Sequence, residues 1–153
     1  MDALARRRFV SALASLPAVL LSMRAARAQS DPFAPLVSQV TGGAPVSSGR
    51  VTVDTPLLAD NGRSVPLKVS VASPMTAADH VRSITLLSEK NPRPVIATFH
   101  LGPNAGRAEV VTRVRLNGTQ RLLAVARLSD GSYWSGGAEV VVTESACLDE
   151  SWS

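Results

Sequence analysis

The stretch AEVVTRVRLNGTQRLLAVARL, from Ala108 to Leu128, contains two runs of alternating side chains around an Asn-Gly pair. One face of the two runs is mostly apolar, with Val110, Thr112, Val114 and Leu116 in the first run and Leu122, Ala124, Ala126 and Leu128 in the second. The opposite face holds Arg113, Arg115, Arg121 and Arg127. A period of two is that of a strand with one buried face. Because Asn117-Gly118 suits a tight turn with positive φ, the stretch predicts a β-hairpin with a core face and a basic face.

The same period of two recurs along the chain from Gly49 onward. Short runs rich in β-branched residues alternate with turn signals, and Asn61-Gly62 predicts a second tight turn. Seven strands are predicted, over residues 50–54, 65–72, 81–88, 95–101, 107–116, 120–128 and 138–143. Short strands at this spacing predict an all-β fold, an immunoglobulin-like antiparallel β-sandwich. The 153 residues suffice for one such domain.

A short helix is predicted before the strands. Asp31 is a favoured N-cap and Pro32 suits the first helical position, while Gly42-Gly43 marks the end. Apolar residues between them follow helical spacing, at Phe33, Leu36, Val37 and Val40. A disordered linker is the alternative interpretation of this segment.

The first 28 residues are typical of an export signal. The basic patch Arg6-Arg7-Arg8-Phe9 precedes an apolar run, and Ala26-Arg27-Ala28 is a small-residue cleavage pattern. Paired arginines followed by Phe9 indicate the twin-arginine route, with an ordinary secretory signal as the alternative. We therefore expect a periplasmic protein that has no membrane segment after signal cleavage.

Removal of this leader changes the charge of the chain. Of the 16 lysines and arginines five lie in the leader, and of the 12 acids only Asp2 does, so the remainder holds 11 of each. The mature part has no long basic run and no aromatic residues interleaved with arginine. Nucleic acid is therefore not an expected partner.

The side chains suited to catalysis are few. His80 and His100 are the only histidines, and they form no recognisable metal-ligand pattern. The sequence has neither a G-x-S-x-G elbow nor a phosphate-binding glycine loop. We expect no cofactor, no metal site and no self-sufficient enzyme.

Cys147, the only cysteine, lies in the polar end of the chain, ESACLDESWS. The strand signal ends near Thr143, so covalent geometry allows the thiol a reach of at most roughly 13 to 14 Å beyond the sheet. A single cysteine outside the cytosol is free, joined to another chain or covalently loaded. The residues alone leave two interpretations open: an incidental free thiol, or a thiol on a mobile arm that is offered to other proteins.

Several segments carry a resemblance to a known family. ADNGRSVPLKVSVASPM, EKNPRPVIATF and TRVRLNGTQRLLAVARLSDGSYW, with the strand that leads to a terminal cysteine, are similar to the sulfur-oxidation carrier protein SoxY. The resemblance covers nearly the whole mature chain. It divides the sequence into a signal peptide (1–28), a helix and linker (29–48), an immunoglobulin-like SoxY domain (49–143) and a C-terminal arm that carries the cysteine (144–153).

The resemblance implies a function. SoxY carriers are periplasmic proteins that pair with a β-sandwich subunit, SoxZ, and hold thiosulfate-derived intermediates covalently on a cysteine near the C-terminus. A haem c enzyme couples thiosulfate to that thiol, and a manganese-dependent hydrolase releases sulfate. The implied attachment site here is Cys147, on a carrier that is itself no enzyme.

The end of the chain departs from the family pattern. The family's arm ends in Gly-Gly-Cys-Gly-Gly, whereas Ser145-Ala146 precede Cys147 here and LDESWS follows it. Glu144, Asp149 and Glu150 surround the thiol with no cation nearby in sequence, and like charge disfavours a thiolate. Two alternatives therefore stay open: a binding or structural module whose cysteine is not loaded, and an intermolecular disulfide through Cys147.

Overall fold

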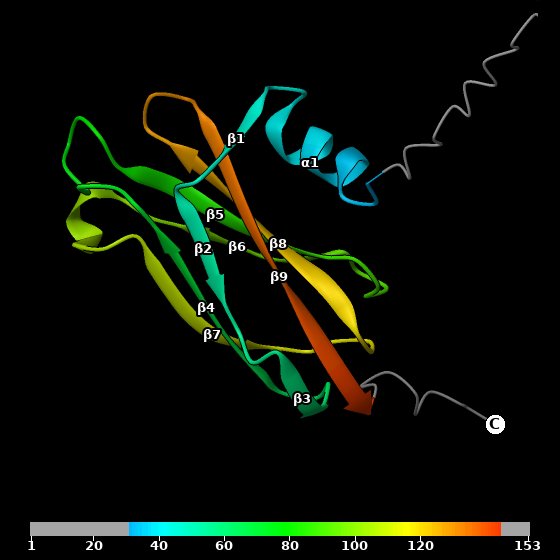
Figure 1. Cartoon of the computed structure of the whole chain (residues 1–153). Coiled ribbons are helices and arrows are strands. Elements are labelled where there is room, and N and C mark those ends of the chain that lie inside the picture. The colour runs from blue at the N-terminus through cyan, green and yellow to red at the C-terminus, as the bar shows by residue number, and fades with distance from the viewer. Residues whose placement is uncertain (1–30, 145–153) are drawn as a thin grey trace, which may run out of the picture.

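A computed structural model describes residues 31–144, and these form two packed β-sheets with one short α-helix (Figure 1). The elements in chain order are α1 (Ala34–Thr41), β1 (Val46–Ser48), β2 (Val51–Asp54), β3 (Leu58–Asn61), β4 (Val65–Val71), β5 (Val81–Ser88), β6 (Val95–His100), the 3₁₀ turn η1 (Pro103–Ala105), β7 (Glu109–Val114), β8 (Gln120–Leu128) and β9 (Tyr133–Glu144). The large sheet has the order β1-β9-β8-β5-β6, with β3 added beside β9, and the small sheet has the order β2-β4-β7. The predicted immunoglobulin-like sandwich is confirmed.

Alternation along the strands places the core between the two sheets. In β4 every second residue from Val65 to Val71 is buried, and β8 contributes Leu122, Ala124, Ala126 and Leu128 as the sequence predicted. Side chains that meet in this core include Ile84, Leu116 and Val140, each with no exposed surface. Burial of this apolar surface is the main term that stabilises the two-layer fold.

The predicted hairpin over residues 107–128 is wrong in its pairing. β7 pairs with β4 in the small sheet, whereas β8 lies between β5 and β9 in the large sheet. Gly118 has the expected positive φ of 78°, but its turn crosses from one sheet to the other. Both edges of β8 are occupied by long antiparallel partners, so β7 has no edge there on which to pair.

Asn61-Gly62 is likewise no hairpin turn. It leads from β3, which pairs with β9, into β4 of the small sheet, and Gly62 is not among the glycines with positive φ. β3, with four residues, and β1, with three, both pair with β9 in parallel. Both were missed because neither VSS nor LADN is a run of β-branched residues with a period of two, unlike the four-residue β2, VTVD.

The single basic face predicted for the hairpin does not exist. Arg113 lies on the small sheet, whereas Arg121 and Arg127 lie on the outer face of the large sheet. Since the core separates these two surfaces, the arginines cannot act as one patch.

The helix begins three residues after the predicted N-cap. Asp31 instead closes a turn before it, because its carboxylate accepts from the Phe33 N–H at 3.3 Å and its carbonyl from the Ala34 N–H at 2.9 Å. Gly42 ends the helix in the left-handed conformation, as predicted. Phe33 is 3% exposed and packs on Leu87 and Val125, so the helix covers part of the outer face of the large sheet (Figure 1).

Gly136 fixes the distance between β2 and β9. A Cβ at this position would lie 2.1 Å from the Val51 carbonyl oxygen, closer than such atoms approach in proteins. The strand therefore needs a glycine where the small sheet crosses it.

Candidate functional site

The end of β9 is the structural root of the C-terminal tail. The Gly62 N–H donates to the Glu144 carbonyl at 2.7 Å. The Thr119 hydroxyl donates to the Val142 carbonyl at 3.3 Å and accepts from the Val142 N–H at 3.0 Å. The Thr143 hydroxyl donates to the Asp60 carbonyl on the other side. Hydrogen bonds on both sides thus hold the last described residues of β9 against the body of the domain.

Three loops meet at this end, and we call residues 61–64, 89–94 and 115–119 the root loops. Asn91 lies at their centre and makes three hydrogen bonds with its side chain. Its amide donates to the Arg115 carbonyl at 2.7 Å, and its carbonyl accepts from the Asn117 N–H at 2.9 Å and from the Gln120 amide at 3.0 Å. One asparagine therefore holds the β5–β6 loop to the link between β7 and β8.

Gln120 and Lys90 complete this network. Gln120 is 2% exposed, and its side-chain oxygen accepts from the Lys90 N–H at 3.0 Å. The Lys90 ammonium donates to the Thr119 carbonyl at 2.6 Å, next to the hydroxyl that holds Val142. The Leu116 N–H donates to the Gly62 carbonyl at 2.8 Å, which ties the third loop to the other two. The end of β9 is consequently bonded to loops that are themselves joined by hydrogen bonds.

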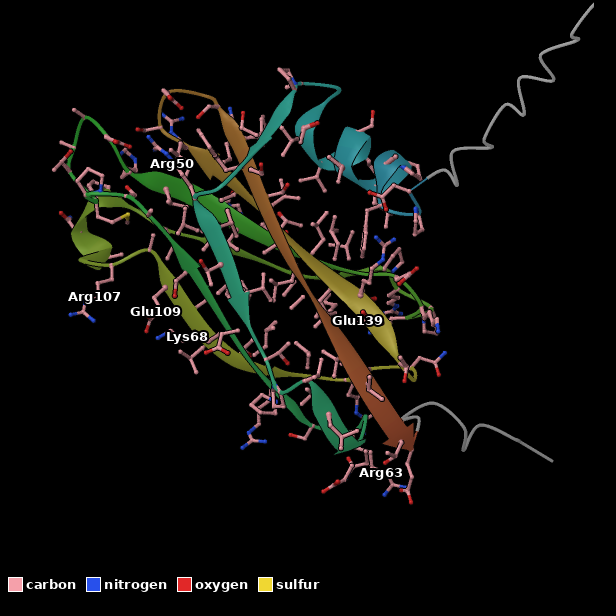
Figure 2. The ribbon with its side chains drawn as sticks, viewed as in Figure 1. Arg50, Arg63, Lys68, Arg107, Glu109 and Glu139 are labelled. Carbon is pink, nitrogen blue, oxygen red and sulfur yellow. The ribbon has the colours of Figure 1, made fainter. Side chains whose placement is uncertain are left out.

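Five exposed cations lie at this end of the sandwich, on the root loops and at the end of β7. We call them the cationic collar; they are Arg63, Lys90, Arg93, Arg113 and Arg115. Figure 2 shows Arg63 where β9 ends and Arg107 at the opposite end of the domain. Arg113 donates to the Ser64 carbonyl and hydroxyl at 3.4 Å, and Lys90 to a carbonyl, so these hydrogen bonds neutralise neither charge.

The collar changes the electrostatic interpretation of the tail. In sequence the thiol has acids beside it and no cation nearby, whereas these five cations lie on the root loops and on the end of β7 that leads into them. The described acids on the same loops and strand ends, apart from Glu89, are Asp60 and Glu144. Glu89 is engaged by Arg121 on the outer face of the large sheet.

Cys147, the predicted attachment site, lies outside the described residues, as do the predicted signal peptide and the arm beyond Glu144. Covalent geometry nevertheless limits its position. Three peptide units connect Glu144 with Cys147, so their Cα atoms are at most roughly 11 Å apart.

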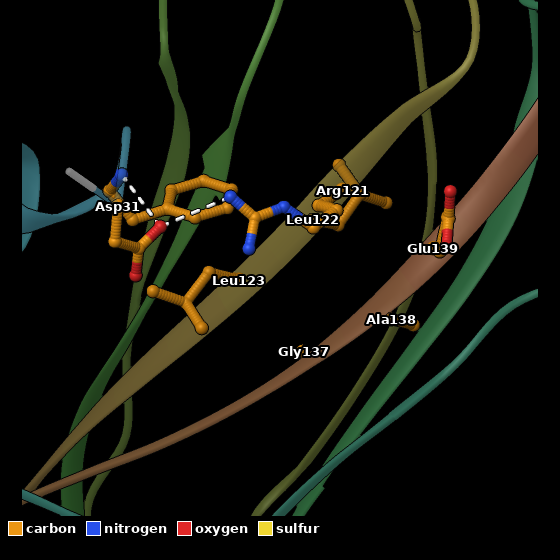
Figure 3. A pocket seen from close by; sticks show the side chains of 8 residues that line it. Asp31, Arg121, Leu122, Leu123, Gly137, Ala138 and Glu139 are labelled. Carbon is orange, nitrogen blue, oxygen red and sulfur yellow. Dashed lines mark hydrogen bonds and ion pairs between the residues drawn. The ribbon is translucent and has the colours of Figure 1, made fainter. Parts of the chain in front are cut away.

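A shallow pocket of about 320 Å³ lies on the outer face of the large sheet, beside the turn that precedes α1 (Figure 3). Its lining includes Arg121, whose guanidinium lies 3.1 Å from the Asp31 carboxylate and 3.4 Å from that of Glu89. The Arg121 N–H bond to the Glu89 carboxylate, together with the guanidinium, lowers the pKa of Glu89. The same two carboxylates raise the pKa of Arg121. Because this arginine is already paired twice, its role is to hold the helix segment on the sheet.

The two histidines have no shared site. The His80 ring nitrogen Nδ1 lies 3.1 Å from the Thr76 carbonyl oxygen. The backbone N–H of His80 donates to the Ser129 hydroxyl at 3.1 Å. His100 is exposed at the end of β6. Within residues 31–144 no three metal-ligating side chains converge, and no helix in that range has the length and apolarity to cross a membrane.

Sequence reasoning missed the root loops as a site. Each loop lies within one of the three segments that carried the family resemblance, around Asn61, Asn91 and Asn117. These segments are far apart in sequence, so their meeting was visible only in the fold. Their polar loop residues were the signal that could have drawn attention to this end.

The fold and this end define a class of protein: a small β-sandwich whose last strand leads into a short extension with a single cysteine. Residues 37–147 match the profile of the family described as sulfur oxidation protein SoxY, and the match extends to Cys147 itself. The chain belongs to the SoxY family.

Solved structures agree with this assignment. The sulfur carrier protein SoxY from Chlorobium limicola f thiosulfatophilum superposes with a TM-score of 0.60 and 25% identity, over 71% of this chain and 89% of that one. A superoxide reductase from Ignicoccus hospitalis gives a TM-score of 0.57 at 17% identity, over 63% of this chain and 94% of the other. One described as putative, from Thermotoga maritima, gives 0.55 at 18%, over 65% and 95%. At those identities the reductases share the fold alone. No curated protein sequence matches the chain.

Proposed function

We propose that this protein is a periplasmic carrier that holds thiosulfate-derived sulfur covalently on Cys147. The observation that carries the proposal is the position of this cysteine, three residues beyond a twelve-residue strand that is hydrogen-bonded into the body up to its last residue. Two further findings support it: the family match includes Cys147, and the similar Chlorobium protein is a sulfur carrier. An anchored root and a short extension present a thiol to other proteins without unfolding the domain.

The chemistry needs only a thiolate from this chain. In the loading step the Cys147 sulfur forms a bond to the outer sulfur of thiosulfate, giving a Cys–S–S–SO₃⁻ group. The thiol proton goes to water and two electrons pass to a haem c partner enzyme. Hydrolysis by a second partner then breaks the S–SO₃ bond, releases sulfate and leaves a persulfide on Cys147. The carrier supplies the sulfur atom and its position, and the partners supply the redox and hydrolytic chemistry.

The proposed assembly is a heterodimer with a SoxZ-like β-sandwich subunit. The leader sequence directs export, which places the carrier in the same compartment as haem c enzymes. When the mature chain is purified from its own periplasm, a second small subunit should co-purify with it in a 1:1 ratio. A chain that elutes alone at its own mass in native mass spectrometry would contradict this part of the proposal.

The decisive experiment is the intact mass of the mature protein from cells grown on thiosulfate, before and after thiol reduction. We expect a reducible sulfur or thiosulfonate adduct on Cys147, and none in a Cys147→Ser variant with an unchanged melting temperature. An unmodified thiol in the wild type would indicate a binding module whose cysteine is not loaded. A mass equal to two chains, lost on reduction, would indicate the intermolecular disulfide.

A further inference from the structure

A second pocket, of about 260 Å³, lies on the outer face of the large sheet beside the end of α1. Its lining contains no acidic residue, and five of its side chains are polar: Ser83, Thr85, Thr98, Arg127 and Tyr133. We propose that this pocket binds a small oxyanion of the class of sulfate and phosphate. The pocket lies beside the first residue of β9, at the opposite end of that strand from the tail, so the inference does not depend on the proposed carrier function.

Strand register brings the polar groups of the pocket together. Ser83 on β5 lies opposite Arg127 on β8, and Arg127 lies opposite Tyr133 on β9. Thr85, two residues further along β5 and on the same face, lies opposite Thr98 on β6. Side chains directly opposed in antiparallel strands have Cβ atoms about 5 Å apart. Four adjacent strands therefore direct polar groups into one small area.

Arg127 supplies the charge that determines the class of ligand. Arg121, on the same face of the same strand, forms ion pairs with the Asp31 and Glu89 carboxylates. Arg127 instead lies over the Tyr133 ring, with 5.9 Å between the guanidinium carbon and the ring centroid, and within residues 31–144 it forms no ion pair. A ring contact leaves the formal charge uncompensated. The pocket therefore has one positive charge and no negative one, which favours an anion.

The hydroxyl groups supply hydrogen-bond donors beside this charge. The Thr85 and Thr98 hydroxyl oxygens lie 3.1 Å apart, and the bond between them uses only one of their two hydrogens. The second hydrogen is therefore available to a ligand. The Ser83 hydroxyl has no hydrogen-bond partner in the described part of the chain. An oxyanion, which accepts hydrogen bonds on every oxygen, matches a guanidinium fork with hydroxyl donors around it.

The volume of the pocket limits the size of the ligand. Pockets that enclose drug-sized molecules usually have volumes of about 300 to 1,000 Å³, and this one is smaller. Val40, Val95 and Val125 complete its lining and offer no further polar group. The pocket therefore suits a single tetrahedral anion better than a nucleotide or another large phosphorylated molecule.

The test is a titration of the full mature chain, labelled with ¹⁵N, with sodium sulfate at pH 7, followed by amide chemical shifts. Sodium chloride at equal ionic strength is the reference, and inorganic phosphate is titrated separately. We expect saturable shifts at Ser83, Thr85, Thr98 and Arg127, with a dissociation constant on the order of 10 mM or lower for at least one of the two oxyanions. Chloride should produce no saturable shift at these amides.

Three variants assign the binding to the pocket. R127Q should weaken it about ten-fold or more, because a hydrogen bond to a charged group is lost. S83A, which removes one neutral donor, should weaken it about three-fold. R107Q is the matched control, since Arg107 is an exposed arginine on the loop before β7 of the other sheet, and it should leave the affinity unchanged (Figure 2).

Four results would overturn the inference: no saturable shift up to about 50 mM of either oxyanion, equal shifts with chloride, saturable shifts centred on other residues, or equal affinity of R127Q and the wild type. Because S83A and R127Q alter exposed or half-buried side chains, their amide spectra should otherwise match the wild type and verify that the fold is intact. None of these results bears on whether the C-terminal cysteine carries sulfur.

Discussion

Asn91 is expected to stabilise the root of the tail through three side-chain hydrogen bonds. The substitution Asn91→Ala removes three hydrogen bonds, to Arg115, Asn117 and Gln120, at 2.7 to 3.0 Å. Each such bond contributes about 1 kcal/mol net, and Gln120 is buried, so its amide is left without that acceptor. Because Asn91 is half-buried and water replaces part of what is lost, we expect destabilisation of about 2 kcal/mol.

Urea unfolding of the mature protein measures this loss. If the free energy of unfolding falls by about 1.5 kcal/mol per molar urea, the urea midpoint should fall by roughly 1.3 M while that slope stays unchanged. Hydrogen exchange should also accelerate at the Val142 amide, because its acceptor Thr119 lies on a loop that Asn91 holds. The matched control is Asn104→Ala, at an exposed asparagine of η1, which should change the midpoint little. If Asn91→Ala costs less than about 0.5 kcal/mol, or if exchange at Val142 is unchanged, Asn91 does not hold the root loops together.

Two other predictions concern the packing and the charges of the body. Gly136→Ala should destabilise the domain by about 3 kcal/mol, since its Cβ would lie 2.1 Å from the Val51 carbonyl and overpacking of this kind displaces backbone. Gly102→Ala, with open space around it, should leave the thermal midpoint nearly unchanged, and equal midpoints for the two variants would contradict the close approach of β2. The pKa of Glu89 is lowered in the folded state, so its contribution to stability is present above the unfolded value near 4.5 and is lost as pH falls through the lower folded value. Glu89→Gln should flatten the loss of stability in that acidic window, and unfolding midpoints that fall equally steeply in both proteins would show that the contact with Arg121 contributes nothing.

The strands could be predicted from the sequence because their period is local. Val65 to Val71 and Leu122 to Leu128 alternate as the sandwich requires, and each reports its buried face without reference to other strands. The same holds for the end of the helix at Gly42, which depends on one residue in the left-handed conformation. The start of the helix was displaced because Asp31 and Pro32 satisfy an N-terminal pattern that the chain uses for a preceding turn.

The pairing of strands was beyond local reasoning. Asn117-Gly118 suits a hairpin turn, yet the chain uses it to cross between sheets because β5 and β9 occupy both edges of β8. The candidate site was hidden for the same reason. Cys147 was predicted from its position and the family resemblance, and it lies outside the described residues; Asn91 and Gly62 are remote from the end of β9 in sequence, so their place at its root could not be predicted.

By itself, the sequence determined which residues are buried, the all-β class, the family and the cysteine that terminates the matched segment, because each depends on residue type and short-range spacing. Tertiary structure alone decided how the strands pair, that the basic residues of 107–128 are divided between two outer faces, and that the three root loops meet where β9 ends. Hydrogen-bond networks depend on distances in space, and the fold brings together residues that are more than 80 positions apart in sequence, such as Gly62 and Glu144.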